Sequence, residues 1–131
     1  MEKVTLRIGR EHYRTELSNG KNTIIADEPP ALGGTDLGLS PGELFIGSLG
    51  ACTGITLRMY ADRKGWDLEE IKVSLSYDYD KEAGKSLINR KIELIGSLDE
   101  DQRTRLLQIA NACPIHKTLQ NPIEIITQLV P

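Results

Sequence analysis

The chain is poor in aromatic side chains and has no long apolar run. Its 131 residues include one Trp and one Phe, so the core must consist mainly of Leu, Ile, Val and Ala. No stretch of about eighteen uninterrupted apolar residues occurs, so we expect no membrane-spanning segment. Residues Met1 to Val4 lack the basic and apolar regions that begin a signal peptide. We therefore expect a single domain over residues 1–131, located in the cytoplasm.

The chain also lacks a strong excess of positive or of negative charge. The chain has 16 basic and 19 acidic residues and a net charge of -3, and no basic patch occurs, so we expect no nucleic-acid partner. Cysteine is scarce, with Cys52 and Cys113 as the only two. Thiols in the cytoplasm stay reduced unless they cycle in catalysis, so this pair is a candidate for reactive thiols rather than for a structural disulfide.

Apolar periodicity predicts strands in clusters and three helices. The strands are expected over residues 4–8, 12–17, 22–26, 71–79, 87–95 and 123–130, and the helices over 41–64, 98–112 and 114–119. Asn19-Gly20 is a hairpin signal, so the first three strands form an antiparallel meander. Residues 27–40 contain two prolines and several glycines, which exclude a regular element. Because strands do not alternate singly with helices, the predicted fold class is α+β.

The first predicted helix is long and nearly apolar all round. Ser40 and Glu43 form a capping box at its start, Pro41 suits its first position, and Gly65 ends it. Between residues 44 and 56 the side chains on almost every side of this helix are apolar or small. A helix that is apolar on every side is buried on every side. One chain of this size hardly supplies enough cover, so we expect a partner subunit to contribute.

The two cysteines have different local settings. Cys113 precedes Pro114 and caps the third predicted helix, where free N–H groups and the helix dipole lower a thiol pKa. His116, one turn further, adds positive charge or relays a proton. Cys52 lies mid-helix among apolar neighbours, where desolvation raises a thiol pKa. From the residues alone, Cys113 is the better thiolate, although a role as an ordinary core residue explains it equally well. Cys52, taken by itself, is better explained as a core residue than as a catalyst.

Other chemistries fit the sequence less well. Two Cys and two His (His12 and His116) match the ligand count of a zinc site, but only Cys113 and His116 are close in sequence. A Cys–His hydrolase needs a third orienting group and an oxyanion hole, for which no signature occurs. We therefore expect no metal and no other cofactor.

The segments Ser40-Pro41-Gly42-Glu43-Leu44-Phe45, Gly50-Ala51-Cys52-Thr53 and Asn111-Ala112-Cys113-Pro114-Ile115-His116-Lys117-Thr118-Leu119 resemble the OsmC/Ohr family. These are the osmotically inducible and organic hydroperoxide resistance proteins. The resemblance implies an OsmC-like intertwined homodimer in which antiparallel sheets wrap around two long central helices. It also implies a thiol-dependent peroxidase that reduces organic hydroperoxides and needs no metal or haem.

The resemblance assigns roles to individual residues. Cys52 matches the peroxidatic cysteine and Cys113 the resolving one, with an external dithiol as reductant. Glu43 and an arginine, Arg10 in preference to Arg14, would activate Cys52. The chain departs from the family pattern where Gly42 occupies the slot of the usual glutamate, so that Glu43 lies one position late. The alternative is an OsmC-related dimer that binds a small ligand, or serves in stress, without peroxidase turnover.

Overall fold

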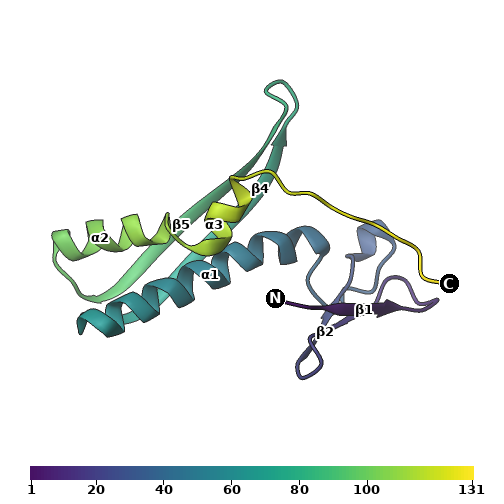
Figure 1. Ribbon diagram of the computed structural model, residues 1–131, viewed down its shortest axis with the longest axis horizontal. Coiled ribbons are helices and arrows are strands. Elements are labelled where there is room, and N and C mark those ends of the chain that lie inside the picture. The colour runs from purple at the N-terminus through teal and green to yellow at the C-terminus, as the bar shows by residue number, and fades with distance from the viewer. The chain divides into compact units, whose positions relative to one another are not determined.

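The computed structural model describes all residues from 1 to 131, which form two compact units (Figure 1). The first unit is Met1–Gly47 and the second is Ser48–Pro131. Both contain antiparallel strands, and the second contains most of the helical residues. The predicted α+β class is therefore confirmed.

The first unit contains a three-stranded meander. Strands β1 (Thr5–Ile8), β2 (Thr15–Ser18) and β3 (Thr23–Ala26) pair antiparallel in the order β1-β2-β3. The Asn19-Gly20 turn joins β2 and β3 as predicted: the Asn19 side-chain oxygen accepts the N–H groups of Lys21 and Asn22, and Gly20 has a φ of 94°. Glycine adopts this positive φ without strain. The turn differs from the two-residue type because the loop spans residues 19–22 and only Gly20 in it has a positive φ.

The segment that follows β3 is organised around the buried carboxylate of Asp27. That carboxylate accepts hydrogen bonds from the Thr35 hydroxyl and from the N–H groups of Tyr13, Glu28 and Leu37. Burial alone would raise the pKa of Asp27, but these bonds outweigh it, so its pKa lies far below the ordinary value. The expectation that residues 27–40 hold no regular element is wrong in one detail, a single 3-10 turn, η1 (Pro30–Leu32).

Helix α1 (Pro41–Lys64) begins and ends where the sequence predicts. The Ser40 hydroxyl accepts the N–H of Glu43, and the Glu43 carboxylate accepts the N–H of Ser40, which completes the capping box. At the other end Gly65 has a φ of 69°, and the N–H of Trp66 reaches the carbonyl of Ala61. Together with the bond from the Gly65 N–H to the Asp62 carbonyl, this bond forms the C-terminal motif that a glycine stop favours.

The second unit packs helices against a long hairpin. Strands β4 (Asp67–Asp80) and β5 (Lys85–Ser97) pair antiparallel, and α2 (Glu100–Ala110) and α3 (Pro114–Leu119) follow. Figure 1 shows α2 running along the hairpin. Asp99 and Gln102 form the predicted capping box of α2. The core is a cluster of fully or nearly fully buried side chains from α1, β4 and α2: Leu57, Ala61, Leu68, Leu106 and Ala110.

Only one stripe of α1 is covered within the chain. Its buried residues follow a four-residue spacing: Leu49, Thr53, Leu57 and Ala61. Gly50 adds a close approach to β4, because an added Cβ there would lie 2.7 Å from the Leu75 Cδ1 atom. On the opposite side Ile55 and Met59 are 56% and 64% exposed. One chain therefore covers only one side of α1, and burial of the other side by a partner subunit stays a prediction.

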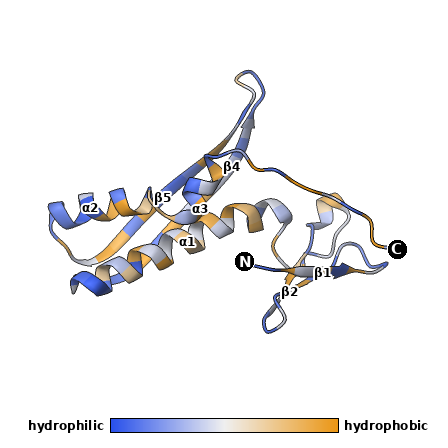
Figure 2. Cartoon of the chain, in the orientation of Figure 1, coloured by the Kyte–Doolittle hydropathy of each residue, from blue (hydrophilic) through white to orange (hydrophobic).

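The apolar character of α1 is continuous along the helix. Figure 2 shows it pale to orange along most of its length, with blue at its C-terminal turn. By length and composition α1 meets the criterion for a helix that crosses a membrane. The core helix of a folded domain meets the same criterion, and the buried stripe of α1 does form part of the core cluster.

The predicted strand over residues 123–130 is absent. The chain beyond α3 has no regular structure, and its apolar side chains are exposed, Ile125 by 82% and Leu129 by 99%. Alternating apolar residues need a neighbouring strand to supply hydrogen bonds and an apolar surface to cover one face. No strand of the chain pairs with this segment, so its periodicity alone does not produce a strand.

Two adjacent leucines of α2 test where the core lies. Leu106 is fully buried and Leu107 is 57% exposed. Leu106→Ala should lower the free energy of unfolding by about 2–5 kcal/mol, because it leaves a cavity. Leu107→Ala is the matched control and should cost much less. Urea denaturation followed by circular dichroism measures both, and equal losses would contradict this placement of the core.

Candidate functional site

Cys52 lies in the middle of α1, between its buried stripe and its exposed side. The side chain is half-buried, and its Sγ atom is 4.0 Å from the Thr56 hydroxyl one turn further along. The thiol is free. A half-buried position leaves the sulfur within reach of a small reactant, which a core position would not allow.

Cys113 is the N-cap residue of α3, as the sequence predicts. Its Sγ atom accepts the backbone N–H of His116 at 3.3 Å, and Pro114 is the first helical residue. The side chain is fully buried, and this thiol is also free. The cap therefore supplies hydrogen-bond stabilisation to the sulfur, while burial keeps solvent and reactants away from it.

The other two predicted site residues, Glu43 and Arg10, lie in the first unit. The Glu43 carboxylate is held at the start of α1 by Ser40, whose N–H and hydroxyl lower the pKa of Glu43. Arg10 is exposed in the bend after β1 and has no ion-pair partner. Arg14, the alternative, forms an ion pair with Glu16 at 2.8 Å. Of these two arginines, Arg10 is thus the one whose charge is not neutralised.

The structure adds a residue that the sequence analysis missed. Arg90, on β5, donates through Nη1 to the Thr53 hydroxyl at 2.9 Å and through Nη2 to the Asn111 side-chain oxygen at 3.0 Å. Nη2 also lies 3.0 Å from Nδ1 of the His116 ring. Thr53 directly follows Cys52, whereas Asn111 and His116 flank Cys113. One guanidinium therefore joins the two chain segments that carry the cysteines.

A sequence signal for Arg90 was present. Strand alternation puts Ile88, Arg90 and Ile92 on one face of β5, and this face packs on the core through Ile92 and Leu94. Arg90 is thus a charge at a position where the pattern calls for an apolar residue. Arg90 is half-buried, and a charge that breaks the apolar pattern of a core-facing strand side is a candidate for a functional site.

Burial and the contact with Arg90 together determine the protonation state of His116. Burial lowers the pKa of His116, and the Arg90 charge lowers it further, so the ring is neutral near pH 7. An arginine can only donate, so Nδ1 of the neutral ring is the acceptor and the proton resides on Nε2. His116 therefore presents one N–H donor and carries no charge.

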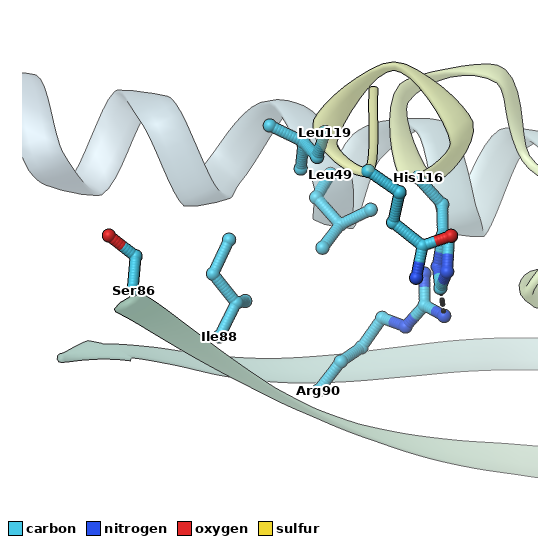
Figure 3. A pocket seen from close by; sticks show the side chains of 7 residues that line it. Leu49, Ser86, Ile88, Arg90, His116 and Leu119 are labelled. Carbon is cyan, nitrogen blue, oxygen red and sulfur yellow. Dashed lines mark hydrogen bonds between the residues drawn. The ribbon is translucent and has the colours of Figure 1, made fainter. Parts of the chain in front are cut away.

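Arg90 and His116 line a pocket of about 400 Å³. Figure 3 shows Ser86, Ile88 and Arg90 rising from one strand toward Leu119 and His116, with Leu49 behind them. The seventh lining residue is Gln120. One part of the wall is polar (Arg90, His116, Gln120 and Ser86) and the other is aliphatic (Leu49, Ile88 and Leu119). No group of three or more His, Cys, Asp or Glu side chains lies close enough to hold a metal ion.

Comparison with known proteins identifies the family. The model of the OsmC-like protein family matches residues 34–128, so the chain belongs to the OsmC family. No curated protein matches the chain. The fold is shared with solved structures of the OsmC and organic hydroperoxide resistance proteins, which confirms the resemblance seen in the two cysteine motifs.

Three solved structures show the range of this similarity. An OsmC-like protein from Mycoplasma pneumoniae has a TM-score of 0.77 and 17% identity, over 92% of this chain and 87% of that one. The organic hydroperoxide resistance protein OhrB of Bacillus subtilis has a TM-score of 0.61 and 27% identity, over 90% and 89%. An organic hydroperoxide resistance protein OsmC from Legionella pneumophila has a TM-score of 0.64 and 21% identity, over 90% and 89%.

The Arg90–His116 contact predicts a pH dependence. In the folded chain His116 should titrate below the ordinary value of 6.5, and Arg90→Gln should raise its pKa by removing the neighbouring charge. The unfolded chain then binds the proton at higher pH than the folded chain. Stability should therefore fall as the pH drops below about 6.5 and through the folded pKa.

NMR titration of the His116 imidazole and urea denaturation between pH 5 and 8 measure these effects. Lys91→Gln is the matched control, because it removes the same charge from the opposite face of β5. It should leave the His116 titration nearly unchanged. A His116 pKa at or above the ordinary value in the wild type, or equal effects of the two variants, would contradict the assigned contact.

Proposed function

We propose that the protein is a thiol-dependent peroxidase that reduces organic hydroperoxides in the cytoplasm, with Cys52 and Cys113 as its redox pair. The observation that supports this proposal is the unequal burial of the two free cysteines in a chain of the OsmC family. Cys52 is half-buried and open to a reactant, whereas Cys113 is fully buried. Local pKa arguments alone favour Cys113 as the attacker, but access favours Cys52.

The proposed cycle has three balanced steps. The Cys52 thiolate attacks the O–O bond of the hydroperoxide and takes one oxygen, so that an alcohol leaves and Cys52 becomes a sulfenic acid. The Cys113 thiol then condenses with this sulfenic acid, a disulfide forms and water is released. An external dithiol reduces the disulfide through thiol exchange and restores both thiols. Because Cys113 is buried, the second step requires local opening around the start of α3.

Arg10 and Glu43 are the residues that we propose to activate Cys52. A thiolate is stabilised by a neighbouring cation, and a carboxylate beside that cation fixes its position. Arg10 has no ion-pair partner in the chain, and Glu43 is exposed. Ser40 lowers the pKa of Glu43, so this carboxylate is ionised at neutral pH and suited to hold a guanidinium.

Peroxidase turnover tests this function. Wild-type protein should consume cumene hydroperoxide or tert-butyl hydroperoxide when a dithiol reductant is supplied. Cys52→Ser should reduce consumption to the level of buffer. Cys113→Ser should stop the normal cycle after the first step and leave a sulfenic acid on Cys52, visible as a dimedone adduct by mass spectrometry. Circular dichroism checks that the buried serine is tolerated.

Two results would reject the peroxidase. One is no turnover by the wild type with any dithiol, and the other is unchanged turnover in Cys52→Ser. A different result would favour the alternative, a family member that binds a ligand or serves in stress without redox chemistry. In that case the thiols would not react with peroxide in the native protein and would react only after unfolding.

We also propose that the protein is a homodimer built on the open stripe of α1, which consists of Ala51, Ile55 and Met59. These side chains are exposed in the chain. Beside them, an added Cβ at Gly47 or Gly54 would have no atom within 4 Å, so a second backbone has room to approach. An exposed apolar face of this kind marks an interaction site.

A charge on the open stripe tests the dimer. Wild-type protein should have twice the 14.5 kDa chain mass in light scattering. Ile55→Glu should lower that mass to one chain or cause aggregation, because a carboxylate would be buried without a partner. Ser76→Glu adds the same charge on the outer face of β4 and should leave the mass unchanged. An undisturbed dimer in Ile55→Glu would show that the interface lies elsewhere.

A further inference from the structure

Arg90 is the one charged residue on the inner face of the hairpin. The inner face of β5 carries Ser86, Ile88, Arg90, Ile92 and Leu94. Opposite them in the register, β4 carries Tyr79, Tyr77, Leu75, Val73 and Ile71. A guanidinium stays protonated at any accessible pH, so this position holds a permanent positive charge beside the apolar core.

No carboxylate neutralises this charge. The ion pairs of the chain are Arg14–Glu16 and Arg58–Asp62, and neither includes Arg90. Its three hydrogen-bond partners, Thr53, Asn111 and His116, are neutral groups. The Thr53 hydroxyl gives its own hydrogen to the Leu49 carbonyl at 2.7 Å, which leaves its lone pairs for Arg90. The guanidinium is therefore oriented by its neighbours and remains uncompensated.

Donors remain available for a ligand. A guanidinium has five N–H donors, and the three contacts of Arg90 use three of them. The neutral ring of His116 contributes its Nε2–H, and Gln120 and Ser86 add polar side chains to the same wall. The polar part of the pocket is thus rich in donors and carries one net positive charge.

The rest of the pocket suits an alkyl group. Leu49, Ile88 and Leu119 form an aliphatic wall beside Arg90, as Figure 3 shows. The volume of about 400 Å³ is in the range of ordinary small-molecule sites. A monoanion matches the single charge of Arg90, whereas a dianion would leave one charge unpaired against an aliphatic surface.

We propose that this pocket binds an aliphatic monocarboxylate, with the carboxylate on Arg90 and His116 and the alkyl chain on Leu49, Ile88 and Leu119. Neither cysteine lines the pocket, so binding requires no thiol chemistry and does not rest on the proposed peroxidase. Bound carboxylate would complete the ion pair that the chain itself leaves open. It would also connect the ligand to the Cys113 segment through His116.

Octanoate is the probe, applied to reduced full-length protein without peroxide. Isothermal titration calorimetry gives the affinity, and amide chemical shifts locate the site. Octanoate should bind and shift the amides of the pocket residues. Octanol, which lacks the charge, and inorganic phosphate, which lacks the alkyl chain, should each bind at least about tenfold more weakly.

Three variants distinguish an effect of the Arg90 charge on binding from an effect on folding. Arg90→Gln should weaken octanoate binding by about tenfold or more, because a charge-assisted contact is lost. Lys91→Gln removes an equal charge from the opposite face of β5 and should change the affinity less than about twofold. Leu119→Glu leaves the Arg90 contacts in place and supplies a competing carboxylate, so it should also abolish binding. This last variant keeps the test decisive if Arg90→Gln does not fold.

Several outcomes would overturn the proposal. They are no octanoate binding at millimolar concentration, equal binding by Leu119→Glu, shifts confined to residues outside the pocket, and octanol or phosphate binding as tightly as octanoate. None of these readouts involves peroxide, so failure here and failure of the peroxidase proposal are distinguishable.

Discussion

The packing of one stripe of α1 against the β4–β5 hairpin and α2 is the constraint on which the second unit depends. Leu57 and Ala61 of this stripe meet Leu106 and Ala110 in the core cluster. The same stripe includes Thr53, which directly follows Cys52 in the helix. The packing of this stripe therefore places Cys52 at the boundary between the covered and open sides of α1. The position of the candidate reactive thiol is therefore a consequence of core packing rather than of a local loop.

Arg90 introduces a second constraint, which is electrostatic. Arg90 is a half-buried charge on the core-facing side of β5, where hydrogen-bond acceptors offset the loss of contact with water. It finds them on the segments that carry the two cysteines, through Thr53 on one and His116 on the other. Burial lowers the pKa of His116 and the Arg90 charge lowers it further, while the guanidinium leaves a positive charge at the wall of a partly aliphatic pocket. Arg90 thus contributes both to the organisation of the pocket and to the protonation state of the ring.

The two cysteines differ in the local stabilisation of the sulfur and in its access to reactants. Helix capping at Cys113 provides an N–H to its sulfur, which by itself favours a thiolate there. Full burial removes that sulfur from incoming reactants, while Cys52 remains half-buried on α1. Hydrogen bonding to the sulfur and access to the sulfur thus favour different cysteines as the nucleophile.

The sequence by itself determined the elements with strong local signals: α1 from Ser40 to Gly65, the Asn19-Gly20 turn, the capping box of Asp99 and the Cys113 cap. These depend on neighbours within a few residues, so a linear pattern contains them. Tertiary structure decided which stripe of α1 is buried, left residues 123–130 without a strand, and brought Arg90 to Thr53 and His116. Those features depend on partners that are distant in the sequence or lie outside the chain, and periodicity carries no information about them.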